Sequence, residues 1–68
     1  MEIQAVYFDI TIWDAASSRK WLKSHNLVPI KRMRIEGTHR RYRIQNPNKY
    51  RSFITKKLPG GVYLVLGK

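Results

Sequence analysis

Residues 30–45 read IKRMRIEGTHRRYRIQ, and this stretch decides the fold. The segments 30–36 and 39–45 are the clearest pair of predicted strands, and polar and apolar residues alternate in them over 32–36 and 41–45. Gly37-Thr38 lies between the two segments, and a two-residue loop with glycine first is typical of the type II′ turn of a β-hairpin. We therefore expect an antiparallel hairpin here.

The turn sets the register of this hairpin. Counting outward from it places four pairs opposite one another: Glu36 and His39, Arg34 and Arg41, Met33 and Tyr42, and Arg32 and Arg43. Successive side chains of a strand point to opposite faces, so one face carries all four of these arginines. The other face carries Met33, Ile35, Arg40, Tyr42 and Ile44. The sequence thus predicts a sheet with one strongly basic face.

The segment before the hairpin predicts a strand and then a helix. Ile3 to Ile10 is rich in β-branched and aromatic residues, which predicts a strand at least partly covered on both faces. Asp14 suits the N-cap of a helix, and Asn26 can adopt the left-handed conformation that ends one before Pro29. The inward face of this helix would carry Ala15, Ser18, Leu22 and His25.

The segment after the hairpin predicts a second helix and a last strand. Asn46 suits an N-cap and Pro47 a first helical position, and the apolar stripe would be Tyr50, Phe53 and Ile54. Pro59-Gly60-Gly61 predicts a turn that ends this helix. Val62 to Leu66 is apolar throughout, which favours a central strand or one covered on both faces.

The predicted order is therefore β-α-β-β-α-β over a single domain, residues 1–68. This order predicts a two-layer α+β fold with a mainly antiparallel sheet and two short helices on one face. The ferredoxin-like arrangement is the candidate for it.

Composition excludes several classes of protein. The chain has no cysteine, so neither a disulfide framework nor a thiolate zinc site is expected. No apolar run has the length of a membrane span. The first residues, MEIQAVYFDI, carry acids where a signal peptide carries bases, so we expect an intracellular protein that is not secreted.

The charge of the chain is large and unevenly distributed. Fourteen lysines and arginines face four acids, a net charge of +10. Three of the acids, Glu2, Asp9 and Asp14, lie near the start. The bases between 31 and 57 are the predicted nucleic-acid-binding residues: Arg32, Arg34, Arg41 and Arg43, extended by Lys31, Arg40, Lys49, Arg51, Lys56 and Lys57. A field of this sign favours a polyanionic partner.

The opposed arginines admit three interpretations. Like charges directly across a hairpin destabilise it, and an anion between the strands would relieve that repulsion, since the planar guanidinium fork binds two phosphate oxygens at once. The arginines could instead pair with Glu2, Asp9 and Asp14, although four acids cannot neutralise 14 bases. They could also simply solvate an exposed sheet face and prevent edge-to-edge aggregation.

No residue pattern predicts catalysis. The two histidines, His25 and His39, make no zinc set, and no serine lies in a nucleophile elbow. Gly60-Gly61 is followed by a predicted strand rather than a helix, so no phosphate-binding loop is present. We expect no enzymatic activity, no cofactor and no metal site.

Eight aromatic residues have two competing roles, core packing and stacking on nucleobases. The spacing of most of them favours the core, with Trp13 and Tyr63 expected to be exposed. No recognition-helix, zinc-finger or RNA-recognition motif is present, so base-specific recognition is not expected.

Several short motifs follow one another from Tyr7 to Lys68: Trp13, Trp21-Leu22, His25, Pro29-Ile30, Arg41-Tyr42-Arg43, Pro47, Thr55-Lys56-Lys57-Leu58 and the apolar end Gly61 to Gly67. Their order resembles that of a short uncharacterised module of tailed phages and of large DNA viruses of amoebae, including marseilleviruses. The resemblance implies a viral protein, made during infection or carried in the virion, without catalytic residues. It also implies that the tryptophan motifs and Arg41-Tyr42-Arg43 belong partly to the fold.

These observations predict a small basic protein that binds nucleic acid, DNA rather than RNA, mainly through its phosphates and with little sequence specificity. In a viral setting it would act in the host cytoplasm or nucleus. The alternative is a homodimeric interaction or assembly module, because a small core with apolar runs at 10–13 and 62–66 gains stability by pairing.

Overall fold

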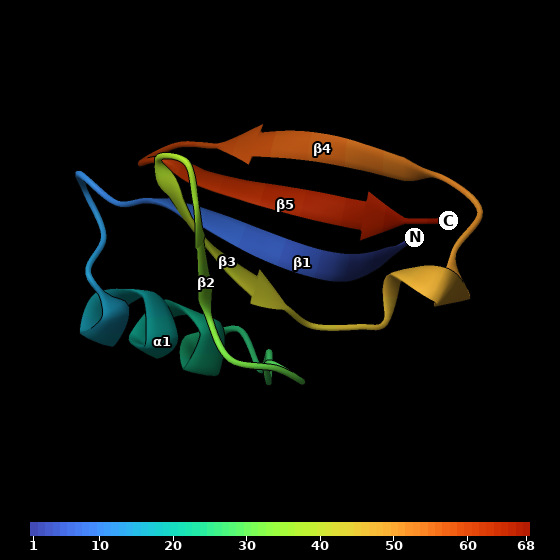
Figure 1. Ribbon diagram of the computed structural model, residues 1–68, viewed down its shortest axis with the longest axis horizontal. Coiled ribbons are helices and arrows are strands. Elements are labelled where there is room, and N and C mark those ends of the chain that lie inside the picture. Colours follow the sequence, from blue (N-terminus) through green and yellow to red (C-terminus); the bar gives the residue numbers. More distant parts are fainter.

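The computed structural model describes residues 1–68 and shows a five-stranded sheet with one α-helix (Figure 1). The elements are β1 (Glu2–Asp9), α1 (Ala15–Ser24), β2 (Arg34–Glu36), β3 (His39–Arg43), the 3₁₀ turn η1 (Pro47–Lys49), β4 (Phe53–Leu58) and β5 (Val62–Gly67). The strands lie in the order β2-β3-β1-β5-β4, and all neighbours are antiparallel. The predicted α+β class with a mainly antiparallel sheet is confirmed.

Helix α1 begins and ends where the sequence predicts. The Asp14 carboxylate accepts a hydrogen bond from the Ser17 amide at 2.7 Å, and the Ser17 hydroxyl accepts one from the Asp14 amide at 3.1 Å. Asn26 has a φ of +58°, the left-handed conformation that ends the helix. The prediction that His25 faces inward is wrong, because its ring is exposed and stacks on Trp21 with 3.8 Å between the centroids.

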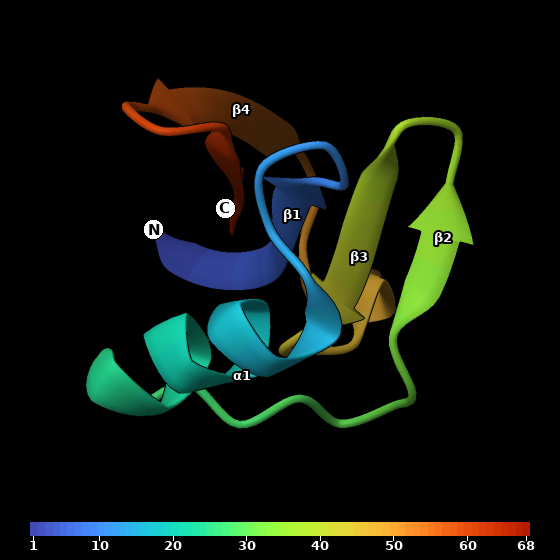
Figure 2. The ribbon, with the colours of Figure 1, turned by 90° about the vertical axis from the view of Figure 1, so that its left-hand side faces the viewer.

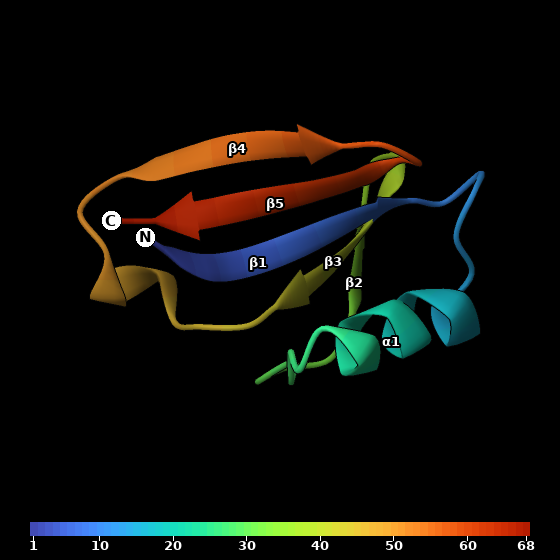
Figure 3. The same ribbon diagram turned by 180° about the vertical axis from the view of Figure 1, so that it is seen from behind.

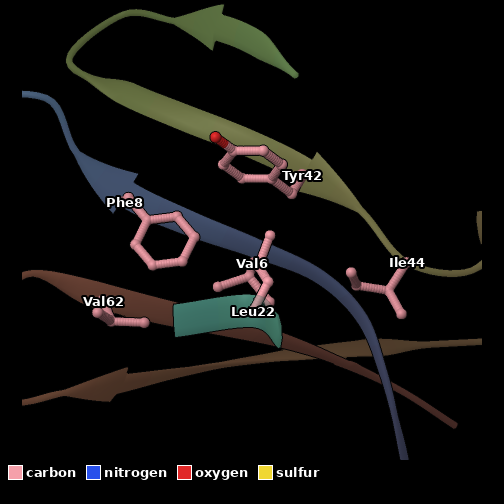
Figure 4. Close-up of a cluster of buried hydrophobic side chains, with 6 residues drawn as sticks. All are labelled: Val6, Phe8, Leu22, Tyr42, Ile44 and Val62. Carbon is pink, nitrogen blue, oxygen red and sulfur yellow. The ribbon is translucent and has the colours of Figure 1, made fainter. Parts of the chain in front are cut away.

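The core lies between α1 and one face of the sheet, as Figure 4 shows. Its six buried apolar side chains are Val6, Phe8, Leu22, Tyr42, Ile44 and Val62. The helix covers the part of the sheet near β1 and β3, whereas β4 lies well away from it (Figures 2 and 3). The opposite face of the sheet has no helix against it.

The predicted hairpin is present, with a shorter ladder than expected. Arg34 lies opposite Arg41 and Glu36 opposite His39, as predicted. Gly37 has a φ of +61° and Thr38 has no positive φ, as a type II′ turn requires.

The ladder between β2 and β3 ends before the predicted Arg32–Arg43 pair. That pair and the Met33–Tyr42 pair are not part of it. The amide of Ile30 donates instead to the Arg43 carbonyl at 2.9 Å, so residues 31–33 arch away from β3. Because Ile30 already occupies the place beside Arg43, Arg32 does not pair with it, and the β2–β3 ladder ends at Arg34 and Arg41.

The predicted second helix is wrong. Asn46 caps and Pro47 begins a single 3₁₀ turn, after which Phe53–Leu58 forms strand β4. Each residue of β4 lies opposite a residue of β5, whose second edge would otherwise be unpaired. Inter-strand hydrogen bonds therefore outweigh the helical spacing of three apolar residues. The ferredoxin-like arrangement, which needs two helices, is not found.

The remaining predictions for this half are confirmed. Pro59-Gly60-Gly61 is a turn, with φ values of +84° and +80° at the two glycines. Strand β5 is interior, between β1 and β4. The single α-helix has ten residues and is neither long enough nor apolar enough to cross a membrane.

Candidate nucleic-acid interface

The face of the sheet away from α1, here called the open face, carries three of the four arginines that were predicted to share one face of the hairpin. The register of the four strand pairs places these side chains on it: Ala5, Tyr7, Asp9, Arg34, Glu36, His39, Arg41, Arg43, Phe53, Thr55, Lys57, Tyr63 and Val65. Its basic residues lie toward β2 and β3 and on β4. Tyr7 and Tyr63 occupy the centre, on β1 and β5.

Five bases converge at the β2–β3 end of the open face. Together with Met33 they line a solvent-open hollow of about 450 Å³, here called the basic hollow: Lys31, Arg32, Arg34, Arg41 and Arg43. Arg32 reaches this hollow from the arch before β2, although it is not paired in the ladder. The predicted four-arginine cluster is therefore present, by a partly different route.

One acid partly neutralises the basic hollow. Glu36 forms an ion pair with Arg41, and the only other ion pair in the structure joins Lys49 to Glu2 at 3.3 Å. Lys31, Arg32 and Arg34 are exposed and have no acidic partner. Arg41 and Arg43 are half-buried against the sheet, as expected if they also serve the fold.

The other acids are engaged elsewhere, so the proposed pairing of the arginines with Glu2, Asp9 and Asp14 is wrong. A hydrogen bond from the Tyr50 hydroxyl, followed by contacts with Lys49, lowers the pKa of Glu2. Hydrogen bonds from the Thr11 hydroxyl and amide lower the pKa of Asp9. Those from Ser17 lower the pKa of Asp14. Asp9 and Asp14 are thus held by the turn and the cap that follow them, and Glu2 by two residues at the end of η1.

The remaining predicted bases do not form one patch. Arg40 lies on the helix-covered face, and its Nε donates to the Trp13 carbonyl at 3.1 Å. Lys56 also lies on that face, opposite Leu64, whereas Lys57 lies on the open face. The last two, Lys49 and Arg51, are exposed on and just after η1, beyond the far end of the sheet from the β2–β3 turn.

Four aromatic predictions need correction. Trp13 and Tyr63, expected to be exposed, are half-buried, and Phe53, expected in the core, is exposed. The Trp13 indole N–H donates to the Gly60 carbonyl at 2.7 Å, and its ring lies 5.2 Å from that of Phe8. Tyr7, expected in the core, lies half-buried on the open face directly opposite Tyr63. Alternation along β1 carried this signal, since Tyr7 has the opposite parity to its core neighbours.

The chain matches no protein-family model, no curated protein and no solved structure. What the site can do is therefore inferred from its own residues. Guanidinium and ammonium groups that converge without acidic partners bind anions, and arginine forks suit phosphate oxygens in particular.

Proposed function

We propose that the protein binds nucleic acid through its phosphates, with little dependence on sequence. One observation carries this proposal: five bases line a single hollow of about 450 Å³, with one acid to offset them. Phosphate contacts of this kind supply affinity and orientation but carry no sequence information. The predicted absence of enzymatic activity remains part of the proposal.

The opposed arginines support the same conclusion. Arg34 and Arg41 are direct cross-strand neighbours, about 5 Å apart at their Cβ atoms. Glu36 pairs with Arg41 and leaves Arg34 unpaired. A phosphate between the two strands would give Arg34 its partner. The resemblance to viral modules extends the proposal to a protein that meets viral or host DNA during infection.

Fluorescence anisotropy tests the proposal with labelled duplex DNA, single-stranded DNA and RNA, each titrated at about 50 and 200 mM salt. If about five phosphates of a duplex are neutralised, the slope of log K against log salt should be about −4.5. Absence of binding to all three at the lower salt would refute the proposal.

A charge-matched pair of variants separates the basic hollow from bulk charge. Arg32→Gln with Arg34→Gln removes two exposed bases of the hollow, and Arg19→Gln with Lys20→Gln removes two exposed bases of α1. None of the four forms an ion pair, so both variants should fold. The slope should become shallower by about 1.8 for the first and change little for the second. Equal effects would mean that only net charge matters.

The alternative function, a homodimeric assembly module, is favoured by strand β4. It is an edge strand, and Phe53 and Ile54 are each 47% exposed, so a second chain could add to the sheet there. Sedimentation of the wild type and of Ile54→Lys tests it. A dimer that this substitution dissociates would support the module, whereas a wild-type monomer at high concentration would exclude it.

A further inference from the structure

A row of five side chains crosses the open face from one edge of the sheet to the other. In strand order the row consists of Arg34, Arg41, Tyr7, Tyr63 and Lys57, each directly opposite the next. Its two central members are aromatic and half-buried, and its outer members are basic. An open antiparallel face that only meets water is usually polar along its length, so two tyrosines at its centre need an explanation.

Both tyrosines line a second hollow on the same face, here called the aromatic hollow. Its volume is about 350 Å³, and its lining consists of Tyr7, His39, Thr55, Tyr63 and Val65. The His39 ring meets both tyrosine rings edge-on, with centroid distances of 6.4 Å to Tyr7 and 5.1 Å to Tyr63. The Lys57 ammonium lies 6.0 Å from the Tyr63 centroid. The rings are thus held in place beside a cation.

The two hollows adjoin. Arg41 lines the basic hollow and Tyr7 the aromatic hollow, and these residues are cross-strand neighbours. A phosphate held by the arginines would therefore lie about one strand spacing, roughly 5 Å, from a tyrosine ring. A single polymer whose phosphates and planar rings alternate at short intervals could fill both hollows.

We propose that the aromatic hollow stacks unpaired nucleobases, so that the ligand of the open face is single-stranded nucleic acid. This inference rests on the proposed function, because the basic hollow must hold the phosphates. Aromatic rings beside bases on a positively charged surface bind single strands without regard to sequence, since every base has a π-face. A duplex keeps its bases stacked inside, so half-buried tyrosines could not reach them, and only the phosphate contacts would remain.

A second aromatic pair on the same face extends the track. Tyr50 packs over Gly67, where an added Cβ would collide with its ring, and Phe53 meets Tyr50 edge-on at 6.0 Å. Gly67 lies four residues beyond Tyr63 on β5, or about 13 Å. A nucleic-acid strand that runs along β5 would pass the aromatic hollow and then the Tyr50–Phe53 pair, and would end beside Arg51.

Anisotropy with labelled oligodeoxythymidine, an abasic deoxyribose-phosphate oligomer of the same length and a duplex of that length tests this inference. Tyr63→Leu keeps an apolar side chain but removes the ring, and Tyr63→Phe keeps the ring. We expect Tyr63→Leu to bind oligodeoxythymidine about tenfold more weakly, and Tyr63→Phe to bind it like the wild type. Neither should change binding of the abasic oligomer or the duplex.

The outcomes separate this inference from the proposed function. Equal wild-type affinity for oligodeoxythymidine and the abasic oligomer would overturn base stacking and leave phosphate binding intact. Equal weakening of all three ligands by a Tyr63→Leu variant that folds like the wild type would also overturn it, since the ring would then not act through the bases. Absence of binding to any ligand would remove the proposed function and the inference together. The comparison of two ligands on the wild type decides the matter even if Tyr63→Leu does not fold.

Discussion

Ser18 and Tyr42 form the only hydrogen bond between two buried side chains, with 2.7 Å between their oxygens. The Ser18 hydroxyl also lies 2.8 Å from the Asp14 carbonyl, to which it donates. A carbonyl oxygen can only accept, so both hydroxyl protons find an acceptor only when Tyr42 donates to Ser18, its single partner, and we assign the bond in this direction. The two ends of this bond are therefore not equivalent.

This asymmetry predicts unequal effects of the two deletions. Ser18→Ala leaves the Tyr42 hydroxyl buried without a partner and should cost about 2 kcal/mol, whereas Tyr42→Phe leaves Ser18 bonded to the helix and should cost about 1 kcal/mol. The double variant should cost less than the two together, because no polar group is then stranded. Urea denaturation measures all three free energies of unfolding. Equal and additive costs would contradict this assignment of the donors.

Three carboxylates are expected to make the stability of the fold change with pH in the acidic range. The pKa values of Glu2, Asp9 and Asp14 are lowered in the fold from ordinary values of 4.5, 3.8 and 3.8, in each case first by a hydrogen bond. A lowered pKa contributes stability above the unfolded value, and that stability is lost as pH falls through the folded value. The Tm should therefore fall below about pH 4.5.

The contribution of one carboxylate can be isolated. Asn caps a helix as well as Asp does, but it does not titrate. Circular dichroism of Asp14→Asn should show a smaller fall in Tm between about pH 5 and pH 2 than the wild type shows. An identical fall would mean that the cap of α1 has no part in the acid sensitivity.

At the scale of the element, the β2–β3 hairpin contains a like-charge pair that the proposed anionic ligand would stabilise. Arg34 and Arg41 repel each other across the ladder, whereas Arg34→Glu would place an opposite charge beside Arg41. This substitution should stabilise the protein by a few tenths to about 1 kcal/mol, reduced by solvent screening because Arg34 is exposed. It should also weaken nucleic-acid binding more than Arg34→Gln does. Denaturation and anisotropy on the same variants measure the two effects. If stability and affinity both rose or both fell, this account of the hairpin would be wrong.

At the scale of the whole molecule, the core is so small that the proposed ligand, once bound, would contribute a large part of the stability. Ten of the 68 residues are buried, and a chain of this length has a margin of roughly 3–10 kcal/mol. A ligand at about 100 times its Kd adds about 2.7 kcal/mol, which in a domain this small raises the Tm by roughly 10–20 °C.

Thermal melts with and without oligodeoxythymidine would detect this stabilisation. The shift should be much smaller for Arg32→Gln with Arg34→Gln, whose own melting without the ligand should be close to that of the wild type. A shift of the same size in both proteins would show that the basic hollow is not where the ligand binds.

Features that depend on neighbours in the chain were predictable from the sequence. Asp14 and Asn26 set the ends of α1, since caps act within one helical turn. Gly37 set the turn and the register next to it, so the juxtaposition of Arg34 and Arg41 followed from the sequence alone.

The sequence by itself thus determined the first helix, the hairpin, the α+β class and the concentration of positive charge on one face of that hairpin. Only the tertiary structure decided that Phe53–Leu58 is a strand. The spacing of Tyr50, Phe53 and Ile54 does not by itself distinguish a helix from a strand, and pairing with the open edge of β5 favoured the strand. It also decided that Tyr7 and Tyr63, from opposite ends of the chain, lie side by side next to the arginines. The physical reason is the same in both cases. The hydrogen bonds of caps and turns depend on residues close together in the chain, whereas strand pairing depends on which strand edges the rest of the chain leaves unpaired.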